Sequence, residues 1–328
     1  MEIDRSDEDQ LKQFWLVGKS AEDAYRPYDF YVPWEAARPS YVEPRPGFVN
    51  QMLGAFEGGR MVGRCYLVFP MRDNTHLCYA DYHVLPDQQR RGVGTALAER
   101  AAQAARDRGR RTIVTEAYVP AGSDGPALAF ARAMGYTEAI DEGIKVVDLV
   151  ETEPTWDMLE REAAARSGGY TLVGWRDVVP EELLDGLCRI NEAFNEEAPS
   201  GELQLEPEVW DAERVRSGEA QNAKVGRRVV AVAALAPDGT MAGLTEAVLN
   251  DHSPQRGFQS GTLVLPEHRG HALGLAMKVA NHRAIRAEFP QCRILVTGNA
   301  GVNAPMNAVN ERLGYREVER CVEVQKGL

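Results

Sequence analysis

Two short glycine-containing segments have residue types and spacing suited to binding a phosphate group. The first reads Gln89-Arg90-Arg91-Gly92-Val93-Gly94, and the second reads Arg269-Gly270-His271-Ala272-Leu273-Gly274. Small residues let the backbone close around an anion, with successive N–H groups pointing inward. A helix that begins directly after such a segment adds the partial positive charge of its N-terminus. The alternative is an ordinary turn between a strand and a helix, which also favours glycine.

These segments belong to an internal repeat. Three ordered stretches of sequence recur at nearly one offset, between 179 and 182 residues, which indicates a duplication. They are Pro86 to Gly94 with Pro266 to Gly274, Ile113 to Thr115 with Leu295 to Thr297, and Met134 to Tyr136 with Leu313 to Tyr315.

The elements that must position the segments follow the same order in both copies. In the first copy the pattern predicts strands at 61–69 and 77–85, a helix from 93 to about 109, a strand at 111–119, a helix at 125–134 and closing strands at 136–150. In the second copy it predicts strands at 241–249 and 258–265, a helix from 273 to about 290, a strand at 293–297 and a helix at 304–313. A charged connecting helix is expected at 151–165, and Ser167-Gly168-Gly169 ends it.

Placed between a strand and a helix, the two segments resemble the acyl-CoA-binding signature of the GNAT acetyltransferase superfamily, Gln/Arg-x-x-Gly-x-Gly/Ala. The segment from Gln89 matches every specified position, whereas the segment from Arg269 has Ala272 in place of the first glycine. A Gly-Tyr pair follows each segment about 40 residues later, as in the family. A dinucleotide-binding loop is the competing interpretation, but the first segment lacks the third glycine of that motif.

The resemblance covers roughly residues 50–150 and 225–325 and implies an α/β fold, layered as in α+β proteins. Each of two GNAT domains would be a mixed, mostly antiparallel sheet flanked by helices. We expect the first domain at 1–150, a helical linker at 151–168 and the second domain at 169–328. The layout is similar to that of mycothiol synthase and related tandem GNAT proteins, in which one domain carries catalysis while the other is chiefly structural.

The resemblance also implies acetyl-CoA as co-substrate and direct attack of an amine on its thioester. The pantetheine arm would follow the edge of the strand before each loop, where a backbone N–H would stabilise the oxyanion. The implied CoA contacts are Val84, Leu85, Gln89, Arg90, Arg91, Gly92, Val93, Gly94 and Thr95 in the first copy, and Val264, Leu265, Arg269, Gly270, His271, Ala272, Leu273, Gly274, Leu275, Asn303 and Asn310 in the second.

The two copies differ at the position where many GNAT enzymes carry a general base. An amine with a pKa of about 10 is protonated at neutral pH, so a base must remove a proton before attack. The first copy has Asp81 at this position, and the second has Gly261. In the second copy Glu246, on the preceding strand, is the candidate instead. The alternative for both acids is a strand carboxylate that faces solvent.

The tyrosine that the family usually employs as the acid is absent from both copies. Ala131 occupies its position in the first copy and Asn310 in the second. Asn303 fits the position of a family asparagine that contacts CoA, although helix capping also explains such residues. On this basis we expect the second copy to be the catalytic one.

Composition limits the possible partners. The hydrophobic share of 44% and charged share of 26% are ordinary for a globular chain. A net charge of −12 disfavours nucleic acid and permits a cationic substrate, although such charge also serves solubility alone. Five scattered cysteines argue against a disulfide framework, and no motif predicts a metal site. With a polar start and no long apolar run, we expect a cytoplasmic protein without membrane contact.

The function expected from these observations is acetyl-CoA-dependent N-acetylation of a small, cationic amine, by a monomer or a homodimer. Two alternatives stay open at this point. One is a non-catalytic acyl-CoA-binding or scaffold protein, suggested by the missing tyrosine. The other is a peptide N-terminal acetyltransferase.

Overall fold

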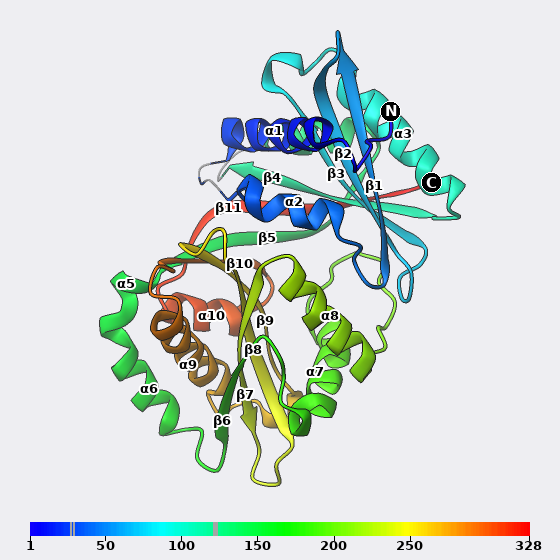
Figure 1. The fold of residues 1–328 in the computed structure, drawn as a ribbon. Coiled ribbons are helices and arrows are strands. Elements are labelled where there is room, and N and C mark those ends of the chain that lie inside the picture. The colour runs from blue at the N-terminus through cyan, green and yellow to red at the C-terminus, as the bar shows by residue number, and fades with distance from the viewer. Residues whose placement is uncertain (27, 29, 121–123) are drawn as a thin grey trace. The chain divides into compact units, whose positions relative to one another are not determined.

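The computed structural model describes residues 1–328 apart from 27, 29 and 121–123. These residues divide into two units, and helices flank the strands of each (Figure 1). The first unit contains Met1–Gly143, Ser200–Glu206 and Val318–Leu328, and the second contains Ile144–Pro199 and Pro207–Glu317.

The first unit has a mostly antiparallel sheet in the order β1-β2-β3-β4-β11. Only the β3–β4 pair in this order is parallel. Its elements are α1 (Glu8–Tyr25), α2 (Trp34–Val42), β1 (Phe48–Glu57), β2 (Arg60–Pro70), β3 (Leu77–Val84), α3 (Val93–Asp107), β4 (Thr112–Pro120), α4 (Gly125–Ala133), β5 (Thr137–Asp148), which continues into the second unit, and β11 (Arg316–Gly327).

Alternation along the strands gives this sheet two faces with different partners. On β2, Cys65, Leu67 and Phe69 pack with apolar residues of α3 in one core cluster. Tyr66 packs instead with α1 residues such as Phe14, in a separate cluster. The same alternation on β3 turns Asp81 and His83 toward α1.

The second unit repeats this architecture in the order β10-β9-β8-β7-β6, with β9 and β10 as its parallel pair. On β7, Ala231 packs with the helix α7 and Val230 with the helix α9, so the sheet is again covered on both faces. The elements are α5 (Leu149–Thr152), α6 (Trp156–Ala164), β6 (Thr171–Arg176), α7 (Leu184–Glu197), α8 (Ala212–Lys224), β7 (Arg227–Leu235), β8 (Met241–Asn250), β9 (Arg256–Val264), α9 (Leu273–Glu288), β10 (Ile294–Ala300) and α10 (Ala304–Arg312).

The parallel pairs separate part-way along their length. In the first unit β3 and β4 are paired only from Leu77 to Tyr79 and from Thr112 to Val114. In the second unit β9 and β10 are paired only from Arg256 to Phe258 and from Ile294 to Val296. Beyond these residues the two strands no longer form backbone hydrogen bonds with each other. Their N–H and C=O groups on this side are left for another partner.

The last strand of the chain completes the first sheet. β11 pairs with β4 in an antiparallel register from Glu319 opposite Pro120 to Gly327 opposite Thr112. Val322 and Val324 of β11 are buried in the core of the first unit. The second domain was expected to span 169–328. In the structure, residues 318–328 belong to the first unit instead.

The elements lie close to the expected positions. The helix expected at 125–134 is Gly125–Ala133, and the strand expected at 77–85 is Leu77–Val84. The charged connecting helix is divided into α5, a 3-10 turn and α6. All five cysteines are free and buried. No helix among the described residues has the length and apolar character needed to cross a membrane.

Candidate active site

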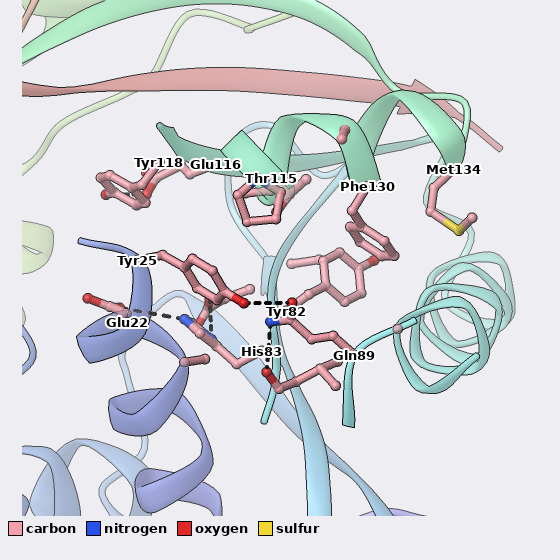
Figure 2. Close-up of a pocket in the computed structure, with 18 of the residues that line it drawn as sticks. Glu22, Tyr25, Tyr82, His83, Gln89, Thr115, Glu116, Tyr118, Phe130 and Met134 are labelled. Atoms are coloured by element: carbon pink, nitrogen blue, oxygen red, sulfur yellow. Dashed lines mark hydrogen bonds and ion pairs between the residues drawn. The ribbon is translucent and has the colours of Figure 1, made fainter. Parts of the chain in front are cut away.

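A cavity of about 740 Å³ opens in the first unit where β3 and β4 separate (Figure 2). Its volume lies in the range of sites that hold a cofactor or a drug-sized ligand. Most of its lining comes from the C-terminal half of α1, the second half of β3, β4 and the helix α4, with further residues from β2, α3 and β11. The glycine-containing segment after β3 also contributes to the lining.

The backbone of the two segments has the same conformation in both units. Left-handed φ angles occur at Arg90 and Gly92 in the first, and at Gly270 and Ala272, 180 residues later, in the second. In each segment the second of these residues, Gly92 or Ala272, is the N-cap of the next helix. Nothing lies within 4 Å of the position where a Cβ would be on Gly92, so the backbone there is open to a ligand. The loops are therefore built alike although their glycines occupy different positions.

The cavity collects most of the predicted contacts in the first copy. Val84, Gln89, Arg90, Gly92, Gly94 and Thr95 line it. Gln89 donates from Nε2 to the carbonyl of Val84 at 3.3 Å and accepts from the Tyr25 hydroxyl at 3.0 Å, so it braces the loop (Figure 2).

The other residues predicted to contact CoA in this copy, Leu85, Arg91 and Val93, make their contacts outside the cavity. The buried Leu85 donates its N–H to the Val62 carbonyl, and Arg91 bonds to Gln88 and Glu57. Val93 packs against the core next to Gly63. These three residues are not in the lining of the cavity.

Asp81, the base expected in the first copy, takes part in an ion-pair group. Its Oδ2 lies 2.8 Å from Nη2 of the fully buried Arg64, and its Oδ1 lies 3.1 Å from Nδ1 of His83. Withdrawal from bulk water raises the pKa of Asp81, but His83 and Arg64 together hold it well below its usual range. A carboxylate held ionised in this way is a weak proton acceptor.

His83 is the titratable group that this arrangement favours as a base. It lines the cavity, and its Nε2 lies 3.6 Å from Oε1 of Glu22 on α1 (Figure 2). Burial lowers the pKa of His83, but the Asp81 carboxylate and Glu22 raise it above its usual value. Glu22 is in turn held by Arg26, which donates to it at 2.7 Å and to Glu319 of β11 at 3.1 Å.

A second acidic group faces the cavity from β4 and β11. Glu116 and Glu323 lie opposite each other in the strand register, and both line the cavity. The Tyr118 hydroxyl donates to Glu116 at 2.6 Å. Burial, with Glu116 and Glu142 nearby, raises the pKa of Glu323 to about 7. A cation between these carboxylates would relieve their repulsion.

The second loop is engaged by its own unit. Arg269 contacts Glu197 and donates from Nε to the Val264 carbonyl at 3.2 Å, the same bracing role as Gln89. The Gly270 carbonyl accepts from Arg166, and the ring of His271 lies against Tyr170.

The remaining residues predicted for CoA in the second copy divide between core and surface. Leu273 and Leu275 are buried, and the Leu265 N–H bonds to the Ala242 carbonyl. Gly274 has nothing within 4 Å of a Cβ position.

Glu246, the other expected base, lines a cavity of about 170 Å³ in the second unit. Phe194 and Trp210 form part of its walls, and no residue of the second loop does. Burial raises the pKa of Glu246 to about 7. The ring of Phe194 covers Gly261, where a Cβ would come within 2.7 Å of it.

The asparagines of the second copy serve the structure of that unit. Asn303 caps α10 and accepts from the Met306 N–H. The fully buried Asn310 accepts from Lys278 Nζ at 2.6 Å and donates to Asn299 at 2.5 Å. Helix capping, the alternative considered for Asn303, is therefore its visible role.

Sequence reasoning missed Glu22, Arg64, His83, Glu116 and Glu323 as members of the site. For His83 a signal existed, since it is two residues from Asp81 on one strand and so shares its face. Glu22 and Glu323 had none, because only the fold brings α1 and β11 to this cavity.

Comparison with known proteins gives the family. The model of the acetyltransferase (GNAT) family matches residues 14–136, which include β3, the first loop and most of the cavity. No curated protein matches the chain. Among solved structures, a tandem GNAT protein from the clavulanic acid biosynthesis pathway, solved without AcCoA, is 27% identical with a TM-score of 0.83, over 100% of this chain and 97% of that one.

A GCN5-related N-acetyltransferase from Sphaerobacter thermophilus has the same fold, with a TM-score of 0.68 at 17% identity, over 99% of this chain and 94% of that one. The matched family model, the repeated separating strand pairs and the full-length similarity agree. Residues 14–136 match the acetyltransferase (GNAT) family, and the whole chain has the fold of a tandem GNAT protein.

Proposed function

We propose that the first unit is the catalytic domain and that it acetylates a small cationic amine with acetyl-CoA. The observation that carries this proposal is the 740 Å³ cavity, which joins the first loop to a set of carboxylates. The family generally uses acetyl-CoA, whose thioester supplies the acyl group that an amine attacks. The sequence favoured the second copy instead, but the cavity around Glu246 is smaller and does not include the second loop.

The residues of the first unit fit the parts of acetyl-CoA. Backbone N–H groups from Gly92 to Thr95, at the start of α3, would bind the pyrophosphate. The edge of β3 from Asp81 to Val84, beyond its pairing with β4, would hold the pantetheine arm. The small lining residues Pro126, Ala127 and Ala129 of α4 leave room beside it.

The charge of the cavity supports a cationic acceptor. Asp81 is paired with Arg64 and Glu22 with Arg26, whereas Glu116 and Glu323 form no ion pair with an Arg or Lys in the described part of the chain. Arg26 acts on Glu116 only electrostatically, and the hydrogen-bond donor to Glu116 is the Tyr118 hydroxyl. A protonated amine is the natural counterion for such a pair. A peptide or protein acceptor finds no comparable support in this lining.

Turnover with a panel of amines tests the proposal. We expect release of free CoA with small diamines or polyamines and much less with neutral amino compounds. In the Glu323→Gln variant KM for the amine should rise about tenfold with kcat little changed, since one charge pairing is lost. Wild-type KM should fall as the pH rises through about 7, because the Glu323 carboxyl then ionises.

The matched control is Glu317→Gln, an exposed residue near the start of the same strand. Equal KM values in wild type and Glu323→Gln would contradict the assigned acceptor site. Absence of CoA release with every amine would contradict the catalytic role itself.

A further inference from the structure

We propose that His83 is the general base of the first unit and that Glu22, Asp81 and Arg64 are its positioning residues. The inference rests on the proposed function, because it assigns a proton acceptor within that same cavity. It replaces the expectation that Asp81 itself takes the proton.

The geometry gives the imidazole one engaged and one available nitrogen. Nδ1 lies 3.1 Å from Asp81 Oδ1 and 3.0 Å from Arg64 Nη2, so its role depends on the tautomer. With the ring proton on Nδ1 it donates to the carboxylate, while Arg64 Nη2 donates to Asp81 Oδ2 at 2.8 Å. The proton on Nδ1 leaves the lone pair on Nε2, which lies on the side of Glu22, at 3.6 Å from Oε1. Both His83 and Glu22 line the cavity, and only 13% of the His83 side chain is exposed. The nitrogen that can accept a proton is therefore next to the space for the acceptor.

Charged and polar groups from every neighbouring element face His83. Asp81 is on the same strand, Arg64 comes from β2 with Nη2 3.0 Å from Nδ1, and Glu22 comes from α1. The ring of Tyr31 lies 6.4 Å away, edge to face. Arg64 also donates to Asp81 Oδ2 at 2.8 Å, so it fixes the carboxylate that orients the imidazole. The two carboxylates outweigh Arg64 and burial in their effect on the pKa of His83, which is raised.

The proton step follows from this arrangement. An N–H bond of the ammonium group breaks, its proton moves to Nε2, and the electron pair stays on the amine nitrogen as the nucleophilic lone pair. The imidazolium formed lies between Asp81 and Glu22, which stabilise its charge. Asp81 keeps its own charge throughout, because Arg64 and His83 hold its pKa low. His83 thus takes the proton, while Asp81, Arg64 and Glu22 hold the imidazole in position.

Kinetics of three variants test the assignment. In His83→Gln, kcat/KM should fall about 100-fold, as when a general base is removed. In Glu22→Gln the fall should be smaller, about tenfold or less, and the acidic limb of the pH profile should move to lower pH, because the His83 pKa falls with the lost carboxylate. The control is His252→Gln, an exposed histidine of the second unit, which should leave the rate and the profile unchanged.

Nuclear magnetic resonance titration of the histidine ring protons supplies a readout independent of turnover. We expect a His83 pKa raised above its usual value in the wild type and a lower one in Glu22→Gln. A wild-type rate and pH profile in His83→Gln would overturn the inference, and so would a His83 pKa that does not respond to Glu22. Calorimetry separates the two proposals: His83→Gln should still bind acetyl-CoA, whereas failure of the wild type to bind it would overturn the proposed function.

Discussion

Corresponding residues in the two copies have different structural roles. Ala98 and Ala131 of the first unit correspond to Lys278 and Asn310 of the second. Lys278 is fully buried. Its Nζ donates a hydrogen bond to Asn310 Oδ1 and lies 4.6 Å from the ring centre of Tyr315. A polar network in the second unit thus occupies the position where the first unit has buried alanines.

Replacing Lys278 by Met should stabilise the second unit at neutral pH. Burial, with Lys145 nearby, lowers the pKa of Lys278 to about 7 from 10.5. The unfolded chain therefore binds the proton more tightly than the folded one between those values, and the wild-type free energy of unfolding rises with pH across that window. We expect Lys278→Met to gain about 2 kcal/mol at pH 7, with the gain disappearing as the pH approaches 10.5.

Urea unfolding at several pH values measures this effect, and exposed Lys224 offers the control variant Lys224→Met. A gain that is the same at pH 7 and pH 10, or no gain at either, would contradict the account of Lys278 as a buried, uncompensated amine.

At the residue scale the sequence located the first loop and did not single out His83, which we propose as the base. The loop is a contiguous pattern that can be found from its spacing, and Gln89, Gly92 and Gly94 line the cavity. His83 and Glu22 are about 60 residues apart in the chain and meet only because α1 packs on the face of β3 that carries His83. The electrostatic effect of buried Arg64 on Asp81 was likewise invisible, since burial depends on packing.

The two glycine-containing segments, from Gln89 and from Arg269, are the part of the chain in which duplication is easiest to follow. Both hold two left-handed residues, but the first has an arginine and a glycine there while the second has a glycine and an alanine. The backbone conformation is therefore conserved between the copies more closely than the residues that favour it. A left-handed non-glycine residue costs roughly 1 kcal/mol.

The substitutions Ala272→Gly and Gly92→Ala should change the free energy of unfolding in opposite directions. Ala272→Gly removes a strained left-handed alanine and should raise the free energy of unfolding by about 0.5–1 kcal/mol. Gly92→Ala introduces the same strain and should lower it by a similar amount. Thermal unfolding of both variants checks this pair, and a loss of stability in Ala272→Gly would contradict the structural equivalence of the loops.

At the element scale the sequence predicted nearly every helix and strand of the repeat, because period and terminators are local signals. It could not predict which strands pair. The segment that forms β11 was assigned to the second domain, yet it pairs with β4 and brings Glu319 and Glu323 to the first unit. Strand pairing over such a distance depends on the complete fold.

The whole molecule is a duplicated chain whose two units differ at their candidate sites. The first unit keeps a large cavity between its separating strands, and it depends on residues from the far end of the chain. In the second unit the loop is braced by Glu197, Arg166 and Tyr170, and the asparagines are engaged in capping and in the core. We therefore expect one working acyl-CoA site per chain.

Calorimetric titration of acetyl-CoA into wild type and two loop variants tests this claim most directly. Thr95→Glu adds a carboxylate at the first turn of α3, where an acidic residue suits the helix but repels a bound phosphate. Gly274→Glu adds one in the second loop, where no atom lies within 4 Å of the new Cβ. We predict one site per chain, affinity lowered at least 100-fold in Thr95→Glu, and unchanged binding in Gly274→Glu. Binding that survives Thr95→Glu and is lost in Gly274→Glu would contradict the account and return catalysis to the second unit.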